Sequence, residues 1–193
     1  MPTQKERRSA TRAKLIAAGR EHFARDGYEA TRTSDILGST GLSRGALYHH
    51  FQDKRELFEA VFVDVSTEAI ELASRRGKRS GSSLELLMSS CASWLRVARR
   101  PEVAPILLDQ GPSVLGWRRA GELESQTSLS LMMSSLESAV RAGEVEVASV
   151  ELTARLLNAL LAEAALAGLY GGFTGAQQEA AVRQFLEGLR PTS

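Results

Sequence analysis

Residues 33–62 read TSDILGSTGLSRGALYHHFQDKRELFEAVF, and this stretch decides the fold. Gly41 divides its first half into two short segments whose apolar residues recur at helical spacing. Glycine tolerates the positive φ angle that a tight turn between two helices requires. The stretch therefore predicts a helix-turn-helix, in which flanking longer helices hold a pair of short ones.

Capping signals give the limits of these helices. We expect short helices over residues 33–41 and 44–51, with Ser43 as the N-cap of the second. Asp53 and Glu56 have the spacing of a capping box, in which Asp takes the place usually held by Ser or Thr. A long amphipathic helix is expected to begin there.

One face of the second short helix is suited to contact DNA. At 3.6 residues per turn, Arg44, Tyr48 and His49 share a face, whereas Leu47 and Phe51 lie on the other. Arg44 lies in the first turn, where it can donate two hydrogen bonds to a guanine. Polar side chains around this face can reach phosphates. The candidate DNA-binding residues are Arg32, Thr33, Ser43, Arg44, Gly45, Ala46, Tyr48, His49, His50 and Lys54.

The rest of the chain also has helical periodicity, and no alternation is long enough for a strand. Gly111-Pro112 is expected to interrupt the helical pattern. The predicted class is all-α. An N-terminal three-helix, helix-turn-helix DNA-binding domain is expected over residues 1–54. A helical ligand-binding and dimerisation domain is expected over residues 55–193. Beyond residue 76, helices are expected over about 83–99, 102–110, 117–142, 150–170 and 175–189.

Composition is that of a soluble globular protein, with 43% hydrophobic and 24% charged residues. No uncharged apolar run reaches 18 residues, and the basic N-terminus lacks the apolar stretch of a secretory signal. We therefore expect a cytoplasmic protein with no membrane partner. The lone Cys91 offers neither a disulfide nor a metal site. Residues 1–55 hold 11 Lys and Arg against 6 Asp and Glu, which favours a polyanion partner at that end.

Catalysis finds no support in the sequence. No glycine-rich phosphate loop, zinc-protease motif or nucleophile elbow occurs, and two of the three histidines are adjacent in the second short helix. The chain is expected not to be an enzyme and to need no cofactor. Two alternatives remain open at this point. One is an enzyme on a helical scaffold, and the other is an architectural DNA-binding protein with a filled core and no effector.

The stretch around the turn resembles the signature of the TetR family over about residues 8–62. That signature has a Gly-Val/Leu-Ser turn followed by Gly-x-Leu-Tyr-x-His-Phe, and then Lys and Leu. Here it reads GLS at residues 41–43 and GALYHHF at residues 45–51, followed by Lys54 and Leu57. The resemblance implies a homodimer on a palindromic DNA operator, with repression relieved by an unidentified small-molecule effector. The sequence departs from the family pattern at Leu37 and Thr40.

The resemblance also implies sites in the C-terminal part of the chain. An effector cavity lies between the middle helices in this family, and a mostly apolar effector is expected. The candidate ligand-binding residues are Met88, Cys91, Trp94, Leu108, Trp117, Met132, Met133 and Leu136. The last two helices form the dimer interface in the family. Its candidates are Leu156, Leu160, Ala164, Val182, Phe185 and Leu189. The alternative is that these side chains only fill the core. His22 is expected at the surface.

Overall fold

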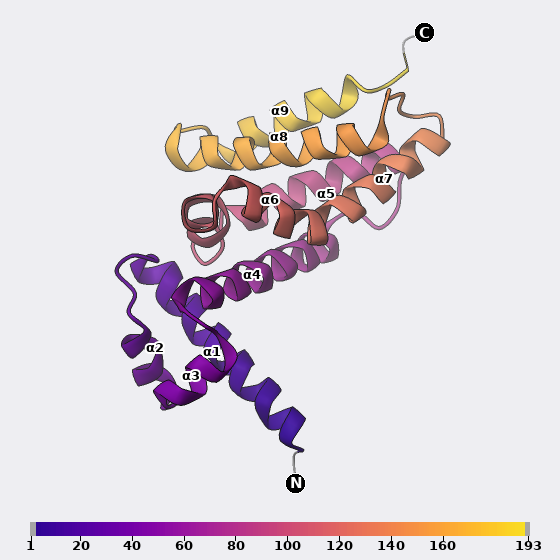
Figure 1. The fold of residues 1–193 in the computed structure, drawn as a ribbon. Helices are drawn as coiled ribbons and strands as arrows, with labels where there is room; N and C mark the ends of the chain where they lie inside the picture. Colours follow the sequence, from indigo (N-terminus) through magenta and orange to yellow (C-terminus); the bar gives the residue numbers. More distant parts are fainter. Residues whose placement is uncertain (1–2, 192–193) are drawn as a thin grey trace. The chain divides into compact units, whose positions relative to one another are not determined.

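The computed structural model describes residues 3–191, except for the side chain of Ser125, and these residues contain helices but no strand (Figure 1). The predicted all-α class is confirmed. The elements in chain order are α1 (Gln4–Asp26), α2 (Thr33–Thr40), α3 (Arg44–His50), α4 (Lys54–Arg76), α5 (Ser83–Ala98), η1 (Pro105–Leu115), α6 (Trp117–Glu124), η2 (Ser125–Leu129), α7 (Ser130–Arg141), α8 (Val150–Tyr170) and α9 (Gly175–Glu187). Both η1 and η2 are π-helices.

The chain forms two compact units. The first contains the described residues up to Ser66 together with Pro101–Ala120, and the second contains Thr67–Arg100 together with the described residues from Gly121 onward. The segment 101–120 was expected in the C-terminal domain, yet it packs with the N-terminal helices. The expected boundary at residues 54/55 separates a DNA-binding part from a ligand-binding and dimerisation part. That functional division stays a prediction.

The core of the first unit is aromatic. The rings of Phe23 and Phe58 meet edge to face with centroids 5.2 Å apart, and Tyr28 meets Phe58 in the same way at 5.3 Å. Such pairs add stabilisation beyond the area they bury. Ile36 of α2 and Leu47 of α3 are fully buried, and both helices pack against α1. Each helix of the first unit therefore contributes apolar side chains to a single core.

The second unit is a helical bundle in which α5 packs against α7, α8 and α9. Its core contains the fully buried Leu84, Leu95 and Leu136. Among residues 3–191, α8 is the one helix whose length and composition would allow it to cross a membrane. It exposes the charged side chains of Glu151, Arg155 and Glu163, and it buries Leu157 and Leu161 within the bundle.

One expected helix limit is wrong, and one expected helix contains an irregular segment. A break was expected at Gly111-Pro112, but η1 continues through both residues to Leu115. Pro112 removes one bond of the ladder, and the chain passes it in the wider π register, which often accompanies such irregularities. Gly111 is needed there because a Cβ at this position would lie 2.4 Å from the Phe62 ring. The single helix expected over 117–142 changes register at η2.

Candidate nucleic-acid interface

The turn between α2 and α3 has the geometry that the sequence predicts. Gly41 lies in the left-handed region, with φ 67° and ψ 16°, and its N–H donates to the Leu37 carbonyl at 2.9 Å. Ser43 caps α3, since its Oγ accepts a hydrogen bond from the Ala46 N–H at 3.1 Å. Two local interactions therefore fix the angle at which α3 leaves the turn.

Helix α3 has one buried and one exposed face. Leu47 and Phe51 are at most 1% exposed, so the core holds this side of the helix. On the other side Arg44 and His49 are exposed, and Tyr48 is 43% exposed. The Arg44 guanidinium lies over the Tyr48 ring, 5.4 Å from its centroid. This contact restricts the rotamers of Arg44 before any base is bound.

The remaining candidates flank this face. Arg32 and Gly45 are exposed, whereas Thr33, Ala46 and His50 are half-buried. The backbone N–H of Arg32 donates to the Asp35 carboxylate at 3.1 Å, which fixes the start of α2. Partial burial and then the neighbouring charges of His49, Arg8 and Arg12 lower the pKa of His50. The electrostatic potential at the end of α3 is therefore positive.

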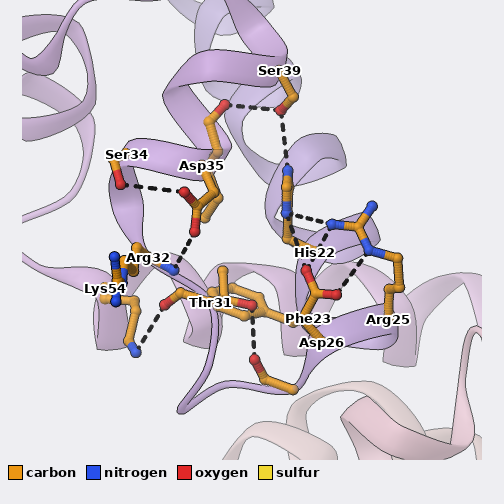
Figure 2. A network of polar contacts seen from close by, with 12 residues as sticks. His22, Phe23, Arg25, Asp26, Thr31, Arg32, Ser34, Asp35, Ser39 and Lys54 are labelled. Atoms are coloured by element: carbon orange, nitrogen blue, oxygen red, sulfur yellow. Dashed lines mark hydrogen bonds and ion pairs between the residues drawn. The ribbon is translucent and has the colours of Figure 1, made fainter.

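Lys54 has internal partners that the sequence did not indicate. Its ammonium donates to the Tyr28 carbonyl at 2.7 Å and to the Thr31 carbonyl at 3.1 Å (Figure 2 shows the second contact). It also lies 4.0 Å from the Tyr28 ring centroid. Lys54 therefore ties the α1–α2 connection to the first residue of α4. A phosphate contact by Lys54 stays a prediction, with at most one N–H left to make it.

The expectation that His22 lies at the surface is wrong, because the residue is only 9% exposed. Its Nδ1 lies 3.0 Å from an Arg25 nitrogen, and its Nε2 lies 3.3 Å from the Ser39 hydroxyl (Figure 2). The same Nδ1 also lies 3.5 Å from an Asp26 carboxylate oxygen. Ser39 then donates to the Ile36 carbonyl at 3.0 Å. His22 thus connects α1 to α2 through directed hydrogen bonds.

Family models cover most of the chain. The model for bacterial regulatory proteins of the tetR family matches residues 15–61, and the model for the tetracyclin repressor-like C-terminal domain matches residues 84–190. The chain belongs to the TetR family of transcriptional regulators. The first match includes the α2–turn–α3 segment described above. The expected resemblance is thereby confirmed, and members of this family are regulators, not enzymes.

Individual relatives agree with this assignment. A TetR-family regulator from Pectobacterium atrosepticum is 30% identical, with 99% of both chains covered and a TM-score of 0.79. The HTH-type transcriptional repressor Rv1474c of Mycobacterium tuberculosis is 32% identical over 121 residues. This match covers 62% of the present chain and 64% of that repressor, which is less than two thirds of its length. RolR, solved with the ligand resorcinol, shares the fold at 15% identity, with 98% and 92% coverage and a TM-score of 0.78.

The eight candidate ligand residues of this TetR-family regulator do not all lie in one unit. Leu108 and Trp117 belong to the first unit, and the other six belong to the second. Trp117 is 76% exposed, which does not fit the wall of an enclosed cavity. Cys91 and Leu136 are buried in the core of the second unit, and burial raises the pKa of the Cys91 thiol to about 12. The half-buried candidates are Met88, Trp94, Met132 and Met133.

The candidate dimer residues also divide by exposure. Leu156 and Phe185 are each 61% exposed, although both are large and apolar. Leu160, Ala164 and Leu189 are half-buried. Val182 is only 3% exposed, so it belongs to the core of the second unit and not to its surface. The spacing of Val182 fitted both readings, and the packing of α9 against α5 and α8 distinguishes them.

Sequence reasoning missed the residues that fasten η1 to the first unit. The Gln110 amide donates to the Phe23 carbonyl at 3.0 Å, next to the end of α1. Arg55 donates to the Val114 carbonyl at 3.3 Å and the Leu115 carbonyl at 3.1 Å. Because these contacts join residues 59 to 87 positions apart, no local pattern reveals them.

One acidic side chain in the second unit was also missed. Burial raises the pKa of the Glu124 carboxyl group, which lies where α6 passes into the π-helix η2. The carboxyl group therefore keeps its proton to a higher pH than an exposed glutamate does. Single π-helical turns frequently occur at functional sites.

Proposed function

We propose that this regulator is a sequence-specific DNA-binding repressor that acts in the cytoplasm as a homodimer and is released from a palindromic operator by a small, mostly apolar ligand. The observation that carries the proposal is the two-faced helix α3. Its apolar face is locked in the core by Leu47 and Phe51, while Arg44, Tyr48 and His49 remain accessible. A helix held in this way can enter a major groove without rearrangement of the unit that holds it.

Exposed apolar side chains on α8 and α9 support the homodimer. Leu152, Leu156 and Phe185 are 58–61% exposed, which is unusual for large apolar side chains in a soluble monomer. Only 22% of the most apolar stretch of α8 is buried. A second copy of the chain would cover these side chains. The dimer would then place two helix-turn-helix units (α2, the turn and α3 of each chain, here called the reading heads) on one palindrome. A site of two halves explains how one short helix per chain achieves specificity.

Half-buried side chains of the second unit support a ligand site. Trp94 offers a broad flat ring, and Met88, Met132 and Met133 adapt to irregular shapes. RolR, which shares the fold of this chain, was solved with the ligand resorcinol. For a tenfold loss of DNA affinity, the ligand must prefer the released state by about 1.4 kcal/mol. Gln110 of η1 donates to the Phe23 carbonyl of α1, and Arg55 of α4 donates to the Val114 carbonyl of η1, so residues 101–120 are joined to the unit that contains α3.

Selection of bound sequences from random duplex DNA tests the proposal, and Arg44→Ala gives it a specific form. We expect the wild-type protein to enrich a palindrome. We expect Arg44→Ala to lose about 1–3 kcal/mol of discrimination at one base pair of each half-site, because a bidentate contact with guanine is removed. The affinities of single-base operator variants for both proteins measure this loss.

His22→Leu is a suitable comparison, because this change affects the internal link to Ser39 and leaves the exposed face of α3 intact. It should weaken binding to all operator variants by a similar factor. If Arg44→Ala keeps the wild-type order of preference, the groove assignment of α3 is contradicted. A screen of small molecules then looks for compounds that release the protein from its operator. If none does, the result favours an architectural DNA-binding protein without an effector.

A further inference from the structure

The N-terminal half of α1 extends beyond the core of the first unit. The first buried side chain of α1 is Leu15, and residues 4–14 before it contribute none. These eleven residues form about three turns of helix, or roughly 16 Å. A capping box between Thr3 and Glu6 holds the start of this segment in helical form. This segment is therefore helical although it adds no buried side chain to the core.

Basic side chains lie along the stripe of this segment that continues the buried face of α1. Lys5, Arg8 and Arg12 are exposed and recur at spacings of three and four, which places them on one side of the helix. Arg12 is directed toward α3, because its guanidinium lies 5.2 Å from the centroid of the Phe51 ring. Phe51 is the residue that ends α3. The stripe therefore runs alongside the end of the proposed recognition helix.

The positive charges of α1 and α3 form one cluster. Besides partial burial, the charges of His49, Arg8 and Arg12 lower the pKa of His50, so these groups lie near one another. Several other arginines of the protein pair with carboxylates, as Arg155 does with Glu151 at 3.0 Å. Among residues 3–191, neither Arg8 nor Arg12 has an ion-pair partner. Uncompensated like charges repel each other, and a polyanion would relieve that repulsion.

We propose that Lys5, Arg8 and Arg12 form a phosphate-binding strip on α1 that extends the DNA interface beyond the helix-turn-helix. This inference rests on the proposed function. The strip contacts the sugar-phosphate backbone that flanks each half-site, and α3 reads the bases. Phosphate contacts set position and affinity without sequence information. They also release condensed counterions, so each contributes about 0.9 to the slope of log affinity against log salt concentration.

The test compares two double variants that remove equal charge from opposite sides of α1. Arg8→Gln with Arg12→Gln removes two members of the strip. Arg7→Gln with Lys14→Gln is the matched control, since both residues are exposed and lie on the other side of the helix. The dimer of the strip variant lacks four arginines, so its salt slope should fall by about 3.6 units and its binding should weaken at least about tenfold at low salt. The control should keep a slope close to the wild-type value, and both should select the wild-type operator sequence.

Conservative variants and thermal unfolding separate charge from structure. Arg8→Lys with Arg12→Lys should restore the slope, because a lysine ammonium also binds a phosphate. A wild-type slope in the glutamine variant of the strip would overturn the inference, and so would an equal loss in the control. A changed base preference would also overturn it, since the strip would then read sequence. If the wild-type chain binds no duplex DNA at all, the proposed function fails first and is distinguished by that result.

Discussion

Phe185→Asp should convert the protein from a dimer into a monomer and weaken its binding to a palindromic operator about a hundredfold or more. The Phe185 ring is 61% exposed on α9, so the change removes little from the core of one chain. In the proposed dimer, it would place an unpaired charge in an apolar interface. A monomer also loses the gain in affinity that comes from linking two reading heads. Sedimentation equilibrium and operator titration measure the two effects.

Leu131→Asp provides a matched control for this prediction. Leu131 is 52% exposed on α7, outside the proposed interface, so this variant should remain dimeric and bind the operator normally. Thermal unfolding of both variants shows whether either change disturbs the fold. A stable dimer of the Phe185→Asp protein would show that the exposed faces of α8 and α9 are not the interface. Association with lipid vesicles instead of dimers would give α8 a membrane role.

Lys54→Met should lower the free energy of unfolding by about 2–3 kcal/mol. The Lys54 ammonium donates to two backbone carbonyls, those of Tyr28 and Thr31, and hydrogen bonds made by a charged group contribute about 1.5–3 kcal/mol. Methionine preserves most of the apolar stem but leaves both carbonyls without this partner. Denaturant unfolding measures the loss. Weaker DNA binding should accompany it, because the start of α2 is no longer tied to α4.

The salt dependence of DNA binding distinguishes this internal role from a phosphate contact. In the proposed dimer, removing a lysine that binds a phosphate should flatten the salt slope by about two units, about one from each chain, and leave the stability unchanged. Removing an internal tie should lower the stability, with a smaller change in slope. Lys78→Met serves as the control, because Lys78 is an exposed lysine in the loop before α5. Unchanged stability in Lys54→Met would contradict the structural role.

Local chemistry made the reading head predictable from the sequence. The positive φ of Gly41, the cap by Ser43 and the two faces of α3 all depend on residues a few positions apart. The match to the TetR signature depends on the same short range. The cap at Asp53 is a further example, since its side chain accepts from the Glu56 N–H at 2.7 Å, although the Glu56 carboxylate accepts from the Gln52 N–H and does not complete the expected capping box.

The errors come from interactions between distant residues. His22 lies at the margin of the apolar stripe of α1, and its burial depends on how α2 packs. Trp117 is a residue type that often lines ligand pockets. Its side chain is nevertheless exposed, and this exposure depends on the tertiary structure. Segment 101–120 belongs to the first unit because of Gln110, Arg55 and other long-range partners. Hydrophobic periodicity contains no information about such partners, so these features required the structure.

The burial of Cys91 has a practical consequence. It is the only cysteine of the chain, it is 2% exposed, and burial raises its pKa to about 12. The thiolate is the species that alkylating reagents modify. The folded second unit therefore protects this sulfur in two ways, because burial keeps the reagent away and also keeps the thiol protonated. Alkylation therefore proceeds only through transient opening of that unit, at a rate governed by its local stability. The alkylation rate of Cys91 therefore reports how often the second unit opens locally, and the measurement needs no engineered label.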